Sequence, residues 1–582
     1  MENKKVLLSV KDLHVKFRVR GRILTAIRGI SLDLYEGESI AIVGESGSGK
    51  SVFTKTFAGM LETNGFIDQG SIIFNDDELA DTHVRMNGIA RFLMNRSLNS
   101  LNRSAKLENG AAIYQQLQEL EADREARLNL SPEEKENLTK RIDDLTFQRT
   151  ELFNLRQTID SSTEKDRFKE VTLQLKQMDQ EIENLKKEEK LALKMHTIAV
   201  KNDAAYNNAY KLRKAELEAD YRASVAEPIS EEALLRNEII AKEIYLSVGR
   251  YGLRKRLQLL FQLGRVFRKA MRQGMDLNND EVRNSVFDQV VFRVRYLDET
   301  PEQLHGTCVL NLAKVQYAKD WTQIRGSRIA TVFQDPMTSL NPIITIGKQI
   351  TSVILKHQKC SETEARARAL ELMKKVGIPN AENRFDDYPF QYSGGMRQRI
   401  VIAIALSCQP KILICDEPTT ALDVTIQAQI LKLIKDLQKD FGYTIVFITH
   451  DLGVVANVAD RVAVLYAGQV VELGTCEEVF YDPRHPYTWA LLSSLPQLAQ
   501  RNTELYSITG TPPSLYNKIV GDAFAPRNPH CLRVDTLKEP PMFQVSETHF
   551  AKTWLLDPRA PKIEKPEAIQ DIHQKLMDAF NI

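Results

Sequence analysis

The stretch that decides the fold is "GESGSGKS" at residues 44–51, which matches the pattern GxxxxGK[ST]. It follows the apolar run "SIAIVG" (39–44), typical of a buried strand, and precedes "VFTKTFAGML" (52–61), typical of a helix. Glycines at these positions let backbone N–H groups surround phosphate without Cβ clashes. We therefore predict a nucleotide-binding loop in which Lys50 reaches the β and γ phosphates and Ser51 ligates Mg²⁺; the plain alternative is a flexible Gly/Ser turn. The predicted nucleotide-binding residues are Gly44, Glu45, Ser46, Gly47, Ser48, Gly49, Lys50 and Ser51.

Three more short apolar runs resemble the first, because each is followed directly by polar residues. They are "RIATVF" (328–333) before "QDP", "KILIC" (411–415) before "DEPTTALD", and "TIVFIT" (444–449) before "HD". Continuous β-branched runs of this length predict strands of a parallel sheet that is buried on both faces. Because ligands bind outside the carboxyl ends of parallel strands, we expect the polar residues to converge on one edge of the sheet.

The polar residues at these strand ends are suited to metal-assisted hydrolysis. Asp416 is placed to hold Mg²⁺ directly or through water, and Glu417 is placed to take a proton from an attacking water. His450 is predicted to touch the γ phosphate, and Gln334 to orient water or metal. The structural alternatives are a solvated acidic loop for Asp416 and Glu417, a strand cap for His450 and a surface turn for Gln334. The prediction is thus Glu417, His450 and Gln334 as catalytic residues, and Ser51, Gln334 and Asp416 as metal ligands.

Bulk composition describes a globular chain of about three units. With 582 residues, 43% hydrophobic, and a net charge of +1, it has no global field that would recruit nucleic acid. Six cysteines without a CxxC pair predict free thiols in a reducing compartment. Because no uncharged apolar run reaches the roughly 18 residues that a spanning helix needs, we expect a cytoplasmic protein whose membrane role depends on partners.

The motifs together resemble one family, the ATP-binding subunits of ABC transporters. Within it they are similar to the ATPases of oligopeptide, dipeptide and nickel importers, and the resemblance covers about residues 5–80 and 320–530. It implies an α/β fold: an ABC-type P-loop NTPase cassette with a parallel core sheet, an antiparallel β subdomain and a helical subdomain. Besides the loop and strand ends, it rests on "FQDPMTSLNP" (333–342), "YSGGMRQR" (392–399) and "HPYTWALLSSLP" (485–496). The predicted domains are 1–80 with 320–480 as the cassette, 81–319 as an insertion, and 481–582 as a C-terminal extension.

The resemblance also explains "YSGGMRQR", a loop that has no nucleophile. In the family, two cassettes sandwich two ATP molecules head to tail, and the signature of one closes over the nucleotide of the other. It implies trans nucleotide contacts from Ser393, Gly394, Gly395 and Asp423. A helix N-cap serine followed by glycines accounts for the same local shape without a nucleotide. Phe17 aligns with the aromatic residue that stacks on adenine, although a strand phenylalanine facing the core is the competing interpretation.

The implied cofactors are ATP and Mg²⁺. The implied partners are a second ABC ATPase subunit, in a heterodimer, two transmembrane permease subunits and an extracellular substrate-binding protein, with no nucleic acid. The chain would sit peripherally at the cytoplasmic face of the membrane, and a helix predicted from the capping-box pattern Ser361 to Glu364 fits the subdomain that receives membrane subunits. Some relatives hold an iron–sulfur centre near the C-terminus. Here Asp522 and Asn528 replace cysteines and Cys531 alone cannot ligate a cluster, so none is predicted.

The insertion between Lys50 and Gln334 is charged and mainly helical. An antiparallel hairpin resembling a short coiled coil is predicted from two apolar repeats. Further on, residues 250–272 hold eight basic residues and no acidic one. They could lie on a membrane surface, bind RNA, or dock on an acidic surface of their own domain. The repeats are Leu138, Leu145, Leu152 and Ile159, and then Phe168, Val171, Leu175, Met178, Ile182 and Leu185.

The leading functional hypothesis is an ATPase subunit that powers import of oligopeptides or dipeptides. The alternative from another class is a soluble ABC ATPase of chromosome maintenance or repair, whose cassette also carries a coiled coil. In those proteins the coil enters after the glutamine loop, whereas here it enters before Gln334. A ribosome-associated ABC protein would carry two cassettes, and one GxxxxGK[ST] occurs here.

Overall fold

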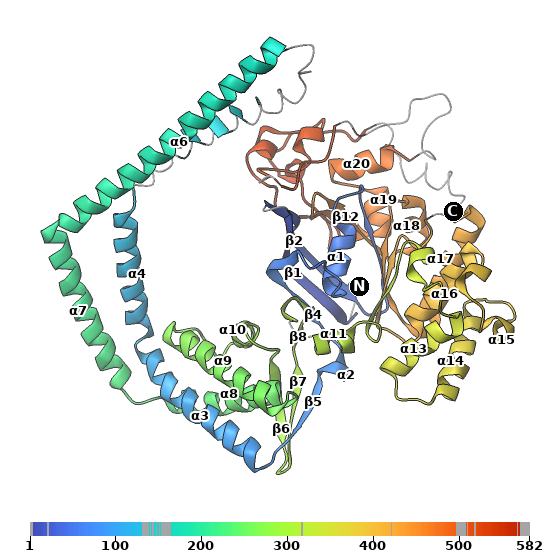
Figure 1. Ribbon diagram of the computed structural model, residues 1–582, viewed down its shortest axis with the longest axis horizontal. Helices are drawn as coiled ribbons and strands as arrows, with labels where there is room; N and C mark the ends of the chain where they lie inside the picture. The colour runs from blue at the N-terminus through green and yellow to red at the C-terminus, as the bar shows by residue number, and fades with distance from the viewer. Residues whose placement is uncertain are drawn as a thin grey trace. The chain divides into compact units, whose positions relative to one another are not determined.

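The chain forms two compact units, Met1–Asp81 with Thr307–Ile582, and Thr82–Gly306. The computed structural model (Figure 1) describes residues 4–19, 22–130, 165–315, 318–420, 422–495, 510–516 and 519–566, with isolated positions in 139–152 and residues 508, 569 and 570. The insertion thus ends earlier than the predicted residue 319. The reason is that β8 (Leu310–Asn311) pairs with β4 (Gly65–Phe74) in a sheet of the first unit. We call the first unit the cassette and the second the inserted unit.

An eight-stranded sheet forms the centre of the cassette, in the order β14-β15-β13-β12-β3-β11-β10-β9. The five strands from β12 to β9 are parallel, and the remaining pairings are antiparallel. The four strands predicted from apolar runs are confirmed as β3, β9, β10 and β11, and they are neighbours. The bounds are β3 (Ser39–Val43), β9 (Ile329–Val332), β10 (Ile412–Asp416), β11 (Thr444–Ile448), β12 (Arg461–Tyr466), β13 (Gln469–Thr475), β14 (Phe543–Gln544) and β15 (Phe550–Ala551).

Burial explains why these strands carry continuous apolar runs. Every residue of β3 and β11 is buried, and a core cluster joins both strands to helices of the cassette, among them α13, α16, α17 and α18. The predicted capping box is confirmed, because Ser361 and Glu364 exchange hydrogen bonds at the start of α14. The cassette helices are α1 (Lys50–Phe57), α2 (Asp77–Ala80), α11 (Ala318–Ile324), α12 (Pro336–Ser339), α13 (Ile346–His357), α14 (Glu362–Lys375), α15 (Ala381–Arg384), α16 (Gly394–Leu406), α17 (Val424–Phe441), α18 (Leu452–Val458), α19 (Cys476–Tyr481) and α20 (Pro486–Ser493).

A second, antiparallel sheet completes the cassette, in the order β2-β1-β4-β8. It contains β1 (Val6–Val19) and β2 (Arg22–Tyr35), which pair along almost their whole length. The parallel core sheet, the antiparallel sheet and the group of helices α13, α14 and α16 match the predicted cassette architecture. The C-terminal extension is not a separate unit, because β15 pairs with β13 of the central sheet.

The inserted unit is mainly helical, with its own apolar core that includes Ile244, Leu263 and Phe267. Buried residues of α6 (Val171, Leu175, Ile182 and Leu185) follow the predicted repeat, and Leu152 packs against Val171 and Leu175. Leu138 and Ile159 lie outside the described residues, so the coiled coil remains a prediction. The bounds are α3 (Gly88–Asn109), α4 (Ala111–Leu128), α6 (Lys165–Asn202), α7 (Ala204–Ala226), α8 (Glu231–Gly249), α9 (Leu253–Arg272) and α10 (Asp280–Phe287), with a three-stranded sheet of β5 (Asp81–Arg85), β7 (Gln303–Cys308) and β6 (Val294–Glu299).

No helix in the described part of the chain combines the length and the apolar character needed to cross a bilayer.

Candidate nucleotide-binding and hydrolysis site

The glycine-rich loop between β3 and α1 is shaped for phosphate. Gly44 has φ of 151°, and a Cβ there would lie 2.2 Å from the Leu465 carbonyl oxygen, so a larger residue is excluded. Lys50 is buried, its Nζ donates to the carbonyl oxygens of Gly44 (2.7 Å) and Glu45 (3.0 Å), and burial lowers its pKa. The hydroxyl of Ser48 is also buried, with no hydrogen-bond partner in the described chain. A cationic donor and an unsatisfied hydroxyl fit the phosphates of a nucleotide, and phosphate binding by Lys50 stays a prediction.

Hard oxygen atoms suited to Mg²⁺ meet beside this loop. Ser51, in the first turn of α1, donates from Oγ to Asp416 Oδ1 at 3.2 Å. Asp416 ends β10, and burial raises the pKa of its carboxyl group. A neighbouring cation would offset this burial, which is the behaviour expected of a metal ligand. Ser51 and Asp416, two of the three predicted ligands, are thus in direct contact.

Glu417 is the centre of the strand-end cluster. Its Oε2 accepts hydrogen bonds from Gln334 Nε2 at 2.7 Å and Thr420 Oγ1 at 3.1 Å, and its Oε1 lies 3.1 Å from His450 Nδ1. Its backbone N–H donates to the Ile448 carbonyl oxygen, and its φ of 47° is unusual for a residue with a side chain. The structure therefore brings together the ends of β9, β10 and β11, as the sequence predicted, and Thr420 is an addition to the predicted set.

The signature loop, "YSGGMRQR" (392–399), is not part of the cluster at the strand ends. Ser393 is the N-cap of α16, and its Oγ accepts the Met396 N–H at 3.4 Å, while Gly394 begins the helix. Ser393 and Gly394 are exposed, and Gly395 approaches α17 so closely that a Cβ would lie 2.8 Å from Ile426 Cγ2. Across the described residues, no hydrogen bond joins Ser393 or Gly394 to the loop at 44–51. An exposed helix N-terminus with small residues is available to an anion from outside the subunit.

The surroundings of Asp423 suit its predicted role at a cassette interface, whereas those of Phe17 do not favour its predicted role in stacking on adenine. Asp423 is the exposed N-cap residue of α17, beside the start of α16, which suits an interface position. Phe17 is 9% exposed in β1, and its ring lies over Gly65 of the neighbouring strand. This placement agrees with the competing interpretation of a strand residue that packs in the sheet. Stacking of Phe17 on adenine remains a prediction.

Two residues of the C-terminal extension, which we did not predict as site residues, hold the phosphate loop. Arg527 donates from Nη1 and Nη2 to the two carboxylate oxygens of Glu45, at 2.7 and 3.0 Å, and this hydrogen bonding raises its pKa. The hydroxyl of Tyr487 accepts the Glu45 backbone N–H at 2.8 Å. Tyr487 lies in "HPYTWALLSSLP", which carries the family resemblance, and Arg527 lies in "GDAFAPRN" (521–528), where Asp522 and Asn528 stand at the cysteine positions of some relatives. No local signal in either stretch points to Glu45.

Replacing Arg527 with alanine is expected to raise the KM for ATP about tenfold, with a smaller change in kcat, because the bidentate bond fixes the loop before nucleotide binds. Steady-state ATPase assays should show a larger change in KM than in kcat. Arg527→Lys should recover part of the loss, and Arg559→Ala, which removes an exposed arginine paired with Asp557, is the control. If Arg527→Ala has the same effect in a Glu45→Gln background, the pair does not position the loop.

The positions of the missing cysteines are occupied by hydrogen-bonding side chains. Asp522 Oδ1 accepts the Phe524 N–H at 3.0 Å, and burial raises the pKa of Asp522 to about 6. Asn528 Oδ1 accepts the His530 N–H at 2.9 Å, and Cys531 is exposed. Oxygen-bearing side chains at these positions do not fit the thiolate set that an iron–sulfur cluster requires.

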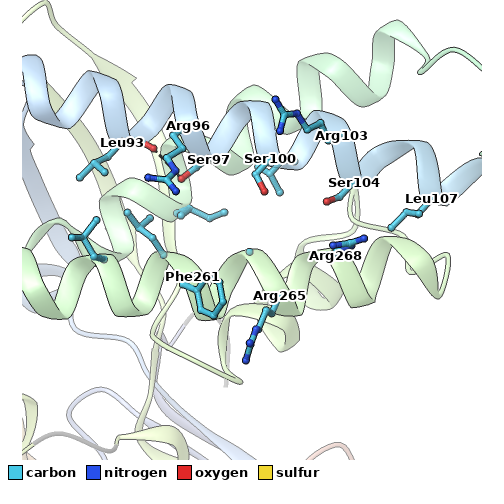
Figure 2. Close-up of a pocket in the computed structure, with 15 residues that line it drawn as sticks. Leu93, Arg96, Ser97, Ser100, Arg103, Ser104, Leu107, Phe261, Arg265 and Arg268 are labelled. Carbon is cyan, nitrogen blue, oxygen red and sulfur yellow. Dashed lines mark hydrogen bonds between the residues drawn. The ribbon is translucent and has the colours of Figure 1, made fainter.

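The basic stretch at 250–272 forms α9 and docks through its apolar side. Leu259, Leu263 and Phe267 are buried in the inserted unit's core. Its other side borders a groove of about 670 Å³ opposite α3 (Figure 2). The predicted alternative of a docked helix is therefore right about docking, and the groove beside the helix carries arginines on both walls. These are Arg96 and Arg103 of α3 and Arg265 and Arg268 of α9.

Comparison with known families identifies the cassette. The model of the family described as "ABC transporter" matches residues 27–197 and 294–420. The chain belongs to the ABC transporter family. A second model, described as "Oligopeptide/dipeptide transporter, C-terminal region", matches residues 471–533 and so includes Tyr487 and Arg527. The gap in the first match falls within the inserted unit.

Similar curated proteins come from several bacteria. "Oligopeptide transport ATP-binding protein AmiE" of Streptococcus pneumoniae is 64% identical over 268 residues, covering 46% of this chain and 76% of the relative. "Oligopeptide transport ATP-binding protein OppD" of Bacillus subtilis is 60% identical, with coverages of 45% and 74%. "Dipeptide transport ATP-binding protein DppD" of Lactococcus lactis subsp. cremoris is 60% identical, with coverages of 43% and 72%. A solved bacterial ABC transporter cassette aligns with 81% of this chain and 98% of its own, at 15% identity and a TM-score of 0.36, too low to bear on the fold.

Proposed function

We propose that this ABC family member is the ATP-hydrolysing subunit that powers import of oligopeptides or dipeptides through a membrane transporter. The observation that carries the ATPase part is the contact of Glu417 with Gln334 and His450 beside the loop of Lys50 and Ser51. The peptide part is supported by relatives at 60–64% identity that are named as oligopeptide or dipeptide transport ATP-binding proteins, and by the matched C-terminal region. These same relatives do not favour the alternative of a chromosome-maintenance ATPase.

In this proposal Glu417 is the general base. Gln334 and Thr420 donate to its Oε2, and His450 contacts its Oε1, so the carboxylate is held in one orientation. Oε2 already accepts two hydrogen bonds, so the remaining lone pair of Oε1 is the one that can accept a proton from water. Lys50 and the loop at 44–51 bind the phosphates, and Ser51, Gln334 and Asp416 hold Mg²⁺. The bound ion supplies charge neutralisation at the phosphates.

The signature acts in trans. Ser393 and Gly394 are exposed at the start of α16, which presents N–H groups and the positive end of a helix to an incoming phosphate. A second cassette packed head to tail would bring its own nucleotide to this position. Asp423, exposed beside it, would lie in the same interface.

Engineered dimers, in which two differently tagged copies of this chain are joined covalently, test this arrangement without the partner subunit. We expect Ser393→Arg in one copy and Glu417→Gln in the other to leave one active site of two, and thus about half of the ATPase activity, because both changes fall on the same nucleotide. ATPase assays on the purified mixed dimers provide the measurement.

The matched control places both substitutions in one copy beside an unaltered copy. In a trans arrangement each site then carries one defect, and activity should be lost. Equal activity of the two mixed dimers, or more activity with both substitutions in one copy, would rule out the trans assignment.

The transport assignment implies membrane partners: a second ABC ATPase subunit, two permease subunits and an extracellular substrate-binding protein, with the chain peripheral on the cytoplasmic face. Purifying the tagged chain from detergent-extracted membranes should recover permease subunits, identifiable by mass spectrometry. The reconstituted complex should take up peptides only with hydrolysable ATP. Recovery of the chain without any membrane subunit would contradict the assignment.

The inserted unit is proposed to be an appended module outside the ATPase core. The chain enters the inserted unit through β5 and leaves it through β7, and these two strands are neighbours in one sheet. Replacing residues 82–306 with a short flexible linker should therefore preserve ATP binding within about threefold, because closing the chain costs little entropy. Titration with a non-hydrolysable ATP analogue measures this. Loss of binding in a folded deletion variant would show that the cassette needs the inserted unit.

What the deletion should change is assembly or coupling at the membrane. We propose that the basic side of α9 contacts anionic lipid beside the transporter. Two variants with the same change in charge would be compared by peptide uptake and by salt-sensitive binding to phosphatidylglycerol vesicles. The test variant changes Arg254, Lys255, Arg268 and Lys269 to glutamine, and the control changes Lys186, Lys187, Lys190 and Lys194. If both behave as the unaltered chain does, α9 has no such contact.

A further inference from the structure

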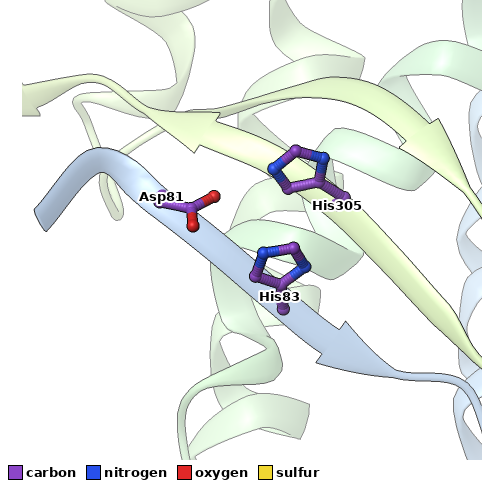
Figure 3. Close-up of side chains that lie close together, drawn as sticks. All are labelled: Asp81, His83 and His305. Carbon is purple, nitrogen blue, oxygen red and sulfur yellow. The ribbon is translucent and has the colours of Figure 1, made fainter. Parts of the chain in front are cut away.

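Two histidines and an aspartate gather on the small sheet formed by β5, β7 and β6. Asp81 and His83 are two residues apart in β5, so their side chains leave the strand on the same face. His305 comes from β7, the neighbouring strand. One potential ligand atom from each residue lies within 4.8 Å of the other two. Figure 3 shows the three side chains close together. This cluster is remote in sequence from every residue assigned to nucleotide chemistry above.

A carboxylate from the third strand orients His305. Asp298 of β6 places Oδ2 3.1 Å from His305 Nδ1. This contact favours the tautomer with the proton on Nδ1 and the lone pair on Nε2. Histidines that bind metals commonly donate their second ring nitrogen to a carboxylate in this way. Because β7 is the middle strand, His305 has Asp298 on one side and His83 on the other.

The two imidazole rings are stacked, with centroids 4.3 Å apart and an interplanar angle of 5°. In this arrangement the nitrogen lone pairs lie in parallel planes and do not meet at one point. His83 is exposed and the torsion about its Cβ–Cγ bond is soft, so its ring can turn out of the stacked arrangement.

We propose that Asp81, His83 and His305 form a binding site for a divalent transition-metal ion, with Asp298 as a positioning residue. Two imidazoles and one carboxylate favour zinc, cobalt, nickel or copper over magnesium and calcium, which prefer oxygen ligands alone. Three protein ligands leave a further position for water. A bound ion would cross-link β5 to β7 and so stabilise this sheet.

The test is a calorimetric titration of the full-length, chelator-treated chain with Ni²⁺, without nucleotide. One saturable micromolar site is expected in the unaltered chain and no such site in His83→Asn or His305→Asn. Asp298→Asn should weaken binding by about 10- to 100-fold, as for a residue that orients a ligand. The matched control is His14→Asn, because His14 lies 3.1 Å from Asp12 in a similar pair that has no third ligand among the described residues. Binding by the six free cysteines would be the same in every variant.

Failure to saturate in the micromolar range, or equal binding by the unaltered chain and a double His83→Asn/His305→Asn variant, would overturn the site. Unchanged affinity in Asp298→Asn would remove the positioning role of Asp298. If the histidine variants do not fold, Co²⁺ titration of the unaltered chain decides, since nitrogen and oxygen ligation gives visible absorption bands that saturate at one ion per chain. A spectrum identical to that of aqueous Co²⁺ would reject the proposal.

Discussion

Replacing Glu417 with glutamine is expected to slow ATP hydrolysis by about a hundredfold or more while leaving ATP binding intact, because the variant lacks the carboxylate proposed to remove a proton from water. Glutamine has nearly the same shape. It also keeps an oxygen that can accept the hydrogen bond from Gln334, which Glu417 Oε2 now accepts at 2.7 Å. The loop at 44–51 is not altered. Single-turnover hydrolysis, measured beside equilibrium binding of ATP, would separate the two effects.

A surface carboxylate provides the control for this prediction. Glu382 in α15 is exposed and paired with Lys374, so Glu382→Gln removes the same charge at the surface of the helical part. It should hydrolyse ATP at the unaltered rate. Near-normal hydrolysis by Glu417→Gln would mean that another group takes the proton, and the proposed mechanism would be wrong.

Replacing Lys50 with alanine should instead weaken nucleotide binding itself, by roughly ten- to a hundredfold, the loss expected for a hydrogen bond to a charged group. The Lys50 ammonium is buried and already directed at two carbonyl oxygens of the loop. We infer that it turns from these acceptors to a phosphate when nucleotide binds. Titration with a fluorescent, non-hydrolysable ATP analogue measures the affinity without interference from turnover.

Lys16→Ala is the matched control, since it removes a lysine that pairs with Asp68 at 2.6 Å in the antiparallel sheet. It should bind the analogue as the unaltered chain does. The Lys50 assignment fails if Lys50→Ala, folded as judged by circular dichroism, binds the analogue with unchanged affinity.

The central sheet and the cluster at its edge were predictable because their signals are local. Each of β3, β9, β10 and β11 is an apolar run of a few residues followed directly by a polar residue. One short stretch therefore predicts both the strand and the side chain at its end. Parallel pairing then obliges those ends to meet. Contact of Glu417 with both Gln334 and His450 follows from this geometry.

The end of the insertion was predicted less well. Residues 307–315 have no motif, and their membership in the cassette depends on a two-residue strand, β8, that pairs with β4. Likewise, Phe17 has the residue type for stacking on a base, but its burial is set by Gly65 in a neighbouring strand. In both cases a partner distant in sequence decides the environment.

The sequence by itself determined the glycine-rich loop, the polar strand ends, the signature helix start and the family, because glycine positions, apolar runs and capping residues act within a few neighbouring residues. Only the tertiary structure decided that Arg527 holds Glu45, 482 residues away, and that His83 stacks on His305. Such contacts depend on which strands become neighbours. Sheet pairing is set by burial summed over the whole chain, and no short stretch encodes it.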